Sequence, residues 1–225
     1  MNQITVIKRD GSREALMIEK WQSQVAKVCK GIADVSQSMI EIKSQPHFYD
    51  ACTTKEIDEI TLRAIVDLID VENNPDIGHT NYQYVAGKQR LTMLRKDVYG
   101  CYDPPNLYDI VKKNVSIGLY TPELLEWYTE DDWNKMNDII DHSKDEDYSY
   151  AAIEQLIEKY LVKNRATKEI YETPQVRYII AAATVFHTEE PNSARMKYIK
   201  EYYNAASDGL FTLATPVLAG LGTPT

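Results

Sequence analysis

The residues best suited to bind a ligand lie near the N-terminus, in the stretch VIKRDGSREALMIEK. Lys8 and Arg9 come directly before an Asp10-Gly11 pair, which is typical of a tight hairpin turn, and Lys20 follows at the start of an amphipathic segment. Basic side chains gathered around a hairpin can hold a polyphosphate through charge-assisted hydrogen bonds. Two basic residues beside a turn are also common on plain protein surfaces, so the pattern alone leaves both interpretations open.

No other group of residues indicates a reaction centre. The four histidines lie far apart, without the spacing of metal ligands, and the sequence contains neither a P-loop nor a G-x-G-x-x-G motif. The acidic run from Asp141 to Asp147 is interpreted as a solvated loop between helices. Cys29, Cys52 and Cys101 have no metal-like spacing and indicate free thiols in a reducing compartment. We therefore expect no metal site.

Length and charge exclude several classes of protein. The 225 residues, 44% of them hydrophobic, suffice for one large domain or two small ones with a real core. The formal net charge of −9 argues against non-specific binding to nucleic acid or to an anionic membrane. The sequence has no run of 18 apolar residues, and its first 15 residues lack the apolar core of a secretory signal. A cytoplasmic location is the expectation.

The elements that would position the basic residues form one predicted unit over residues 1–100. Alternating apolar residues on both sides of Gly11 predict a hairpin, and a helix is predicted over 18–32, with Trp21 on its apolar face. A second helix over 53–69 opens with a capping box, Thr53 to Glu56, and a third over 82–99 ends at Gly100.

The second half is predicted to be nearly all helix. Helices are expected over 104–120, in short pieces over 121–141, and over 148–162, 173–187 and 193–210. Residues 164–173 are interpreted as a polar turn between two short strands, and the segment FTLATPVL, residues 211–218, as a strand.

The whole sequence resembles the large (alpha) subunits of class I ribonucleotide reductases. The segments VIKRDGSREALMIEK, TTKEIDEI, NYQYVAGKQRLTMLRK and VYG are similar to the ATP-cone of that family. The segments DPPNLYD, YSYAAIEQLIEKYLVKNRATKEIYETPQ, RMKYIKEYYNAAS and TPVLAGLGTPT are similar, in the same order, to the first part of its catalytic region. The resemblance implies a mainly α fold with small β elements. Residues 1–100 would be the cone, a short hairpin with about four helices, and residues 101–225 the helical N-terminal part of the ten-stranded α/β reductase barrel, with 211–218 as its first strand.

The resemblance also implies a regulatory nucleotide. The cone of this family binds ATP as activator and dATP as inhibitor, and Mg²⁺ is expected with the nucleotide. The matching positions are basic residues for the phosphates, an acidic residue for the base or ribose, and a helix N-terminus with free N–H groups. They are Lys8, Arg9, Glu14, Ala15, Leu16, Met17, Ile18, Glu19, Lys20, Thr54 and Lys96.

Four positions depart from the family pattern within the cone. Met17 replaces a common Asn, Glu56 stands where the family often has Asp, and Asp58 and Met93 stand where it often has His. These departures bear on the response to dATP more than on the fold.

The resemblance places every catalytic cysteine of the family beyond Thr225, so no catalytic residue is expected within this sequence, and the three cysteines are interpreted as structural. Thr215 matches a family threonine that helps to hold the substrate, a ribonucleoside diphosphate. The implied partners are a radical-generating small (beta) subunit with its metal-radical cofactor, a thioredoxin or glutaredoxin reductant, and the remaining part of the large subunit.

Two hypotheses follow. The chain is an N-terminal piece of a split large subunit and supplies one wall of its active site, or it is a nucleotide-binding regulatory module or truncated chain that performs no chemistry. The wall segment 101–225 favours the first, because a sensor would need only the cone. Under the first hypothesis the strand at 211–218 would dock into the other pieces.

Overall fold

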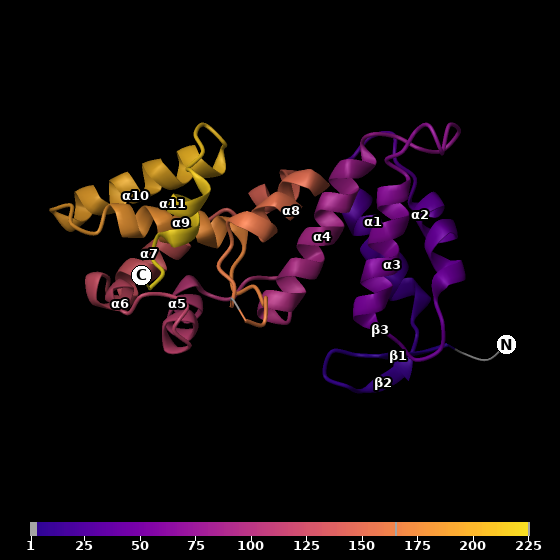
Figure 1. Ribbon diagram of the computed structural model, residues 1–225, viewed down its shortest axis with the longest axis horizontal. Helices are drawn as coiled ribbons and strands as arrows, with labels where there is room; N and C mark the ends of the chain where they lie inside the picture. Colours follow the sequence, from indigo (N-terminus) through magenta and orange to yellow (C-terminus); the bar gives the residue numbers. More distant parts are fainter. Residues whose placement is uncertain (1–3, 165, 225) are drawn as a thin grey trace. The chain divides into compact units, whose positions relative to one another are not determined.

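The computed structural model describes residues 4–164 and 166–224, and this part of the chain is mostly helical with one small sheet, as predicted (Figure 1). It divides into two compact units. The first comprises Met1–Met93 and Asp147–Ile153, and the second comprises Leu94–Glu146 and Glu154–Thr225. The sequence-based division into domains 1–100 and 101–225 stays a prediction. Within the described residues, no helix combines the length and apolar character that crossing a membrane requires.

The sheet of the first unit has three short strands in the order β2-β1-β3. Strands β1 (Thr5–Ile7) and β2 (Arg13–Ala15) form the predicted antiparallel hairpin, and Gly11 takes the positive φ of +83° that its turn requires. Strand β3 (Cys52–Thr53) pairs with β1 in parallel. The sequence did not predict β3, since two residues are too short for a period-two pattern.

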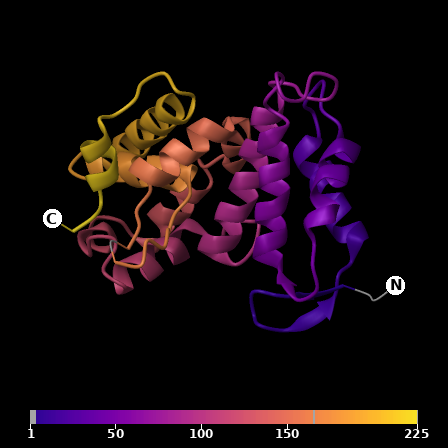
Figure 2. The ribbon, with the colours of Figure 1, turned by 45° about the vertical axis from the view of Figure 1, so that its right-hand side comes forward.

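Helices α1 (Ile18–Cys29), α2 (Gln37–Ser44), α3 (Thr54–Asp67) and α4 (Tyr82–Tyr99) make up most of the first unit, with a 3₁₀ turn η1 (Gln45–His47) after α2. In Figures 1 and 2 the sheet lies at one end of α1 and α3. Trp21 joins these two helices, because its indole N–H donates to Thr61 Oγ1 at 2.9 Å and its ring meets Phe48 edge-on at 5.0 Å. The predicted hairpin with four helices is therefore confirmed.

The rest of the chain is a layer of helices. They are α5 (Leu107–Ser116), α6 (Glu123–Trp127), α7 (Glu130–Asn137), the 3₁₀ turn η2 (His142–Asp147), α8 (Tyr150–Lys159), α9 (Pro174–Val185), α10 (Asn192–Ser207) and α11 (Thr215–Gly220). Helix α9 is buried along most of its length and packs against α10. The predicted helices of this half are confirmed, including the helix that starts at Thr173-Pro174.

The strand predicted over 211–218 is wrong. Residues 211–214 have no regular structure, and helix α11 begins at Thr215 with Pro216 in its first turn. Proline suits a helix start because its φ is preset there, whereas a strand needs a ladder partner, which the described residues do not offer this segment. In place of the two short strands expected on either side of the turn at 164–173, the structure has a single antiparallel bridge between Lys163 and Ile170. Arg165 and Thr225 lie outside the described residues.

Candidate functional site

The hairpin places two of the predicted nucleotide contacts against each other. Lys8 directly follows β1 and Glu14 lies in β2, and the Lys8 ammonium is 2.8 Å from a Glu14 carboxylate oxygen. The hydrogen bond to Glu14 raises the pKa of Lys8, so the side chain stays cationic at neutral pH. The turn between them is fixed by Asp10, whose carboxylate accepts from the backbone N–H of Ser12 at 2.9 Å. Both Lys8 and Glu14 are only half-buried, and a ligand can reach them.

The parallel pairing of β1 with β3 brings the start of α3 to the same place. Ile7 lies opposite Thr53, so Lys8 follows at the level of Thr54, the first residue of α3. The predicted capping box is present: Thr53 Oγ1 accepts from the Glu56 N–H at 3.1 Å, and the Glu56 carboxylate accepts from the Thr53 N–H at 2.7 Å. The N–H groups of Thr54 and Lys55 remain at the positive end of the helix dipole.

The run from Ala15 to Lys20 leads from β2 directly into α1. The Leu16 N–H donates to the Ile4 carbonyl at 2.8 Å, which ties the run to the sheet. Met17 is the N-cap of α1 and is 47% exposed, and its thioether side chain forms no cap hydrogen bond. Glu19 and Lys20 are exposed on the first turn of α1, next to the anchored Trp21.

Of the two remaining predicted contacts, one lies in the hairpin and the other does not. Arg9 is exposed at the hairpin turn. Lys96 lies in the last turn of α4. This end of the helix, from Leu94 onward, belongs to the second unit, whereas the other predicted contacts belong to the first. The structure thus brings together Lys8, Glu14, Thr54 and the run into α1, and their contacts with a nucleotide stay a prediction.

Of the four departures from the family pattern, Asp58 and Met93 are buried, and Glu56 is held by hydrogen bonds. Glu56 also accepts from the Tyr49 hydroxyl at 2.7 Å, and its hydrogen bonds, first of all that from Thr53, hold its pKa low. Asp58 is 4% exposed, and its carboxylate accepts from the Gln24 amide at 2.9 Å. Met93 is buried. Asp58 therefore belongs to a polar network in the interior of the first unit.

The second unit holds the C-terminal segment through a fully buried arginine that the sequence analysis missed. Arg177 of α9 donates to the carbonyl of Leu221 and lies 3.4 Å from a Glu172 carboxylate oxygen. Glu172 also accepts from the Tyr120 hydroxyl and from the Val162 N–H. An arginine inside the apolar run VRYIIAAA was the signal that could have found this network, because a buried charge needs partners.

Helix α11 carries Thr215, the predicted substrate contact. Thr215 is half-buried at the first position of this helix. Downstream, the Gly222 carbonyl accepts from the Thr121 N–H at 2.9 Å, and a Cβ at Gly222 would lie 2.8 Å from the Ile180 side chain. The end of the described chain is therefore packed against α6 and α9, and is neither a strand nor a loose tail.

A second buried charge corrects the interpretation of the acidic run as a solvated loop. Asp145 of η2 is 1% exposed, lies 3.6 Å from the Arg95 guanidinium, and accepts from the Gln175 amide at 3.0 Å. Burial raises the pKa of Asp145 to about 7, although the Arg95 charge opposes this. Burial, with Arg95 nearby, lowers the pKa of His142 to about 4.

The cysteines are free thiols, as predicted. Burial raises the pKa of Cys29 to about 11, so this thiol is protonated and unreactive at neutral pH. Burial likewise raises the pKa of Cys52.

Two family descriptions match the chain and together cover most of it. Residues 4–97 match the ATP cone domain, and residues 146–225 match the all-alpha domain of ribonucleotide reductase. The first match contains the hairpin, Lys8, Glu14 and the start of α3, and the second contains α9, α11 and the C-terminal anchor. The chain thus combines an ATP cone domain with the all-alpha domain of ribonucleotide reductase, and these two domains define its class.

Curated relatives narrow this class. The chain is 42% identical to the ribonucleoside-diphosphate reductase 1 subunit alpha of Escherichia coli over its whole length, covering 29% of that protein. It is 40% identical to the alpha subunit of Haemophilus influenzae (99% of the chain, 28% of that protein) and 35% identical to that of enterobacteria phage T4 (100% and 29%). The chain belongs to the family of ribonucleoside-diphosphate reductase alpha subunits and corresponds to their N-terminal part. It spans less than a third of the length of these relatives.

Proposed function

We propose that this chain is the N-terminal segment of a ribonucleoside-diphosphate reductase large subunit, in which it binds ATP or dATP as a regulator of overall activity. The observation that carries the proposal is the ion pair of Lys8 and Glu14 beside the N-terminus of α3, inside the segment that matches the ATP cone. A cation and free helix N–H groups that meet at one point form a phosphate site.

The pairing of Lys8 with Glu14 sets the orientation of the nucleotide. Phosphates are repelled by the Glu14 carboxylate, so they approach Lys8 from the side of Thr54 and draw the ammonium away from Glu14. Glu14 then becomes free to accept from a ribose hydroxyl or from the base. Lys20, on the first turn of α1, and Arg9 add positive charge for the outer phosphates. Mg²⁺ that accompanied the nucleotide would neutralise part of the remaining phosphate charge.

We further propose that the second half supplies one wall of the site where ribonucleoside diphosphates are reduced. Thr215 contacts the substrate from the first turn of α11, and the Arg177 network holds the segment after α11 in place. The thiols that reduce the substrate come from the remaining part of the large subunit, and the radical comes from the metal-radical cofactor of a beta subunit. A thioredoxin or glutaredoxin restores the thiols.

Reconstitution tests the reductase assignment. The chain is mixed with the remaining part of the large subunit, expressed separately, with a beta subunit, dithiol and a ribonucleoside diphosphate. The expected result is deoxynucleotide formation by the mixture and none by either piece alone. Two results contradict the proposal: turnover by the 225-residue chain by itself, or equal activity of the remaining part with and without this chain. The second result favours a regulatory module.

Hydrogen exchange tests the regulatory assignment separately. Addition of ATP is expected to slow amide exchange in 8–20 and 53–56, the two segments that the sheet brings together. Protection confined to any other part of the chain refutes the cone site whatever the result of reconstitution.

A further inference from the structure

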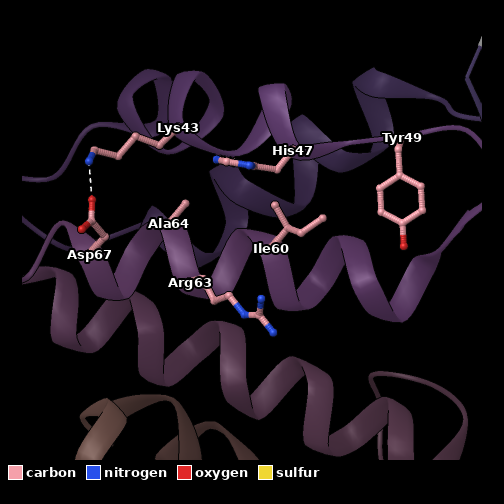
Figure 3. A pocket seen from close by; sticks show the side chains of 7 residues that line it. All are labelled: Lys43, His47, Tyr49, Ile60, Arg63, Ala64 and Asp67. Atoms are coloured by element: carbon pink, nitrogen blue, oxygen red, sulfur yellow. Dashed lines mark hydrogen bonds and ion pairs between the residues drawn. The ribbon is translucent and has the colours of Figure 1, made fainter.

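A pocket in the first unit lies between α2 and α3, apart from the residues assigned to the nucleotide (Figure 3). Its volume of about 480 Å³ is within the range of small-molecule sites. This cavity is called the α2–α3 pocket here. It is lined by Lys43, His47, Tyr49, Ile60, Arg63, Ala64 and Asp67.

The charges of this pocket are not balanced. The Lys43 ammonium is paired with the Asp67 carboxylate and also donates to the Asn74 amide oxygen at 2.9 Å. Asp67 is the only acid that lines the pocket, and Lys43 engages it. The side chains of Arg63 and His47 have no hydrogen bond or ion pair with any residue that the structure describes. The pocket thus has a permanent positive excess in a chain whose formal net charge is −9.

The pocket also has an apolar part. Ile60 and Ala64 of α3 lie beneath η1, and the Tyr49 ring stands at one end of the same face (Figure 3). Tyr49 is 50% exposed, and its hydroxyl donates to Glu56, so its ring is held in place while half of the residue's surface stays accessible. A flat or apolar group that covers this surface removes it from water.

The placement of Arg63 decides the shape of the ligand. Its guanidinium extends away from His47 in Figure 3, and Arg63 also lines a neighbouring hollow of about 390 Å³, together with Glu59, Leu62, Val66, Asp67 and Tyr150. A ligand that contacts both the guanidinium and the aromatic end therefore has to be elongated. Arginine binds phosphate through two parallel N–H···O bonds, which favours a phosphate as the anionic end.

We propose that the α2–α3 pocket is a binding site for a small phosphorylated aromatic compound, with its phosphate on Arg63 and its ring on His47, Tyr49 and Ile60. This site goes beyond the regulatory nucleotide, because it shares no residue with the positions assigned to ATP. The inference therefore stands or falls independently of the proposed function.

The test is a titration of the isotope-labelled full chain with phenyl phosphate, followed by two-dimensional NMR, in parallel with phenol and inorganic phosphate. Saturable shifts are expected at residues 43–49 and 60–67. Phenyl phosphate is expected to bind more tightly than phenol or inorganic phosphate. Arg63→Ala is expected to weaken it about tenfold or more, since a charge-assisted contact is lost. Arg13→Ala, which removes an equally exposed arginine outside the pocket, is the matched control and leaves the affinity unchanged.

Three results overturn the proposal: no saturable shift at these residues, shifts confined to residues 8–20, or an equal loss of affinity in Arg63→Ala and Arg13→Ala. Equal binding of phenol and phenyl phosphate also overturns it, because the phosphate would then contribute nothing. His47→Ala provides a second variant, expected to weaken phenyl phosphate and to leave inorganic phosphate binding at Arg63 unchanged. Arg63 and His47 are both exposed, so neither substitution removes a buried contact.

Discussion

Gly87→Ala is a sharp test of the packing of the first unit, because Gly87 lies in the middle of α4 against the backbone of residue 148. A Cβ atom placed on Gly87 would be 2.1 Å from the Tyr148 carbonyl oxygen and 3.1 Å from the Ser149 carbonyl carbon. Both neighbours are backbone atoms and cannot rotate away as a flexible side chain can. These two residues belong to the segment Asp147–Ile153, which is part of the first unit although the residues before and after it belong to the second. This segment must move for alanine to fit at position 87.

Two effects of opposite sign set the magnitude. Alanine in a helix interior is normally more stable than glycine by about 1 kcal/mol. Overpacking that forces a backbone shift costs about 3 kcal/mol. The expected net change is a loss of about 2 kcal/mol in the free energy of unfolding, measured by urea denaturation with far-UV circular dichroism.

Gly220→Ala is the matched control for this experiment. Gly220 ends α11, and no atom lies within 4 Å of a Cβ built on it, so alanine there is expected to leave stability unchanged or slightly higher. A Gly87→Ala chain as stable as the wild type, or more stable, would refute the close approach of α4 to residues 147–149.

Three further outcomes are expected. Thr53→Ala removes one side of the capping box and should lower the free energy of unfolding by about 1 kcal/mol, and an unchanged urea midpoint would argue against the cap. The pKa of Asp145 is about 7 in the folded chain and has its ordinary value of 3.8 in the unfolded chain. As the pH rises, the Asp145 carboxyl therefore loses its proton in the unfolded chain before it does so in the folded chain. Relative to Asp145→Asn, the wild type should lose on the order of 4 kcal/mol of stability between pH 4 and pH 7, and a pH-independent difference would refute this. Gly222→Ala, with a positive φ and Ile180 in the way, should speed amide exchange in residues 218–223, and unaltered exchange there would contradict the anchored segment.

Local patterns were sufficient for most of the fold. The Asp10-Gly11 turn, the Thr53 capping box and the Thr173-Pro174 helix start each depend on neighbouring residues, and all three are present in the structure. Strand β3 and helix α2 were not predicted. The pairing of β3 with β1 joins residues about 45 positions apart, which no local pattern can express. The strand at 211–218 was predicted from apolar alternation, but Pro216 and the absence of a ladder partner in the described chain favour a helix.

The candidate site was predictable in part. Lys8 and Glu14 could be paired from the hairpin alone, whereas the proximity of Thr54 required β3. Asp145 was misjudged because an acidic run is usually solvated, and its partner Arg95 lies 50 residues earlier in the chain. Such buried charges are recognised only when the packing around both partners is known.

The most direct test of the central claim is calorimetric titration of the full chain with dATP and ATP, comparing the wild type with Lys8→Ala. The account predicts saturable binding of nucleotide to the wild type. It also predicts affinity lower by about tenfold to a hundredfold in Lys8→Ala, since a charge-assisted contact contributes about 1.5–3 kcal/mol. Lys30→Ala, which removes an exposed lysine of the same unit at the C-terminal end of α1, outside both the hairpin and the α2–α3 pocket, should bind as the wild type does. Absence of nucleotide binding by the wild type, or equal affinities in the wild type and Lys8→Ala, would contradict the assignment of this hairpin as the regulatory nucleotide site.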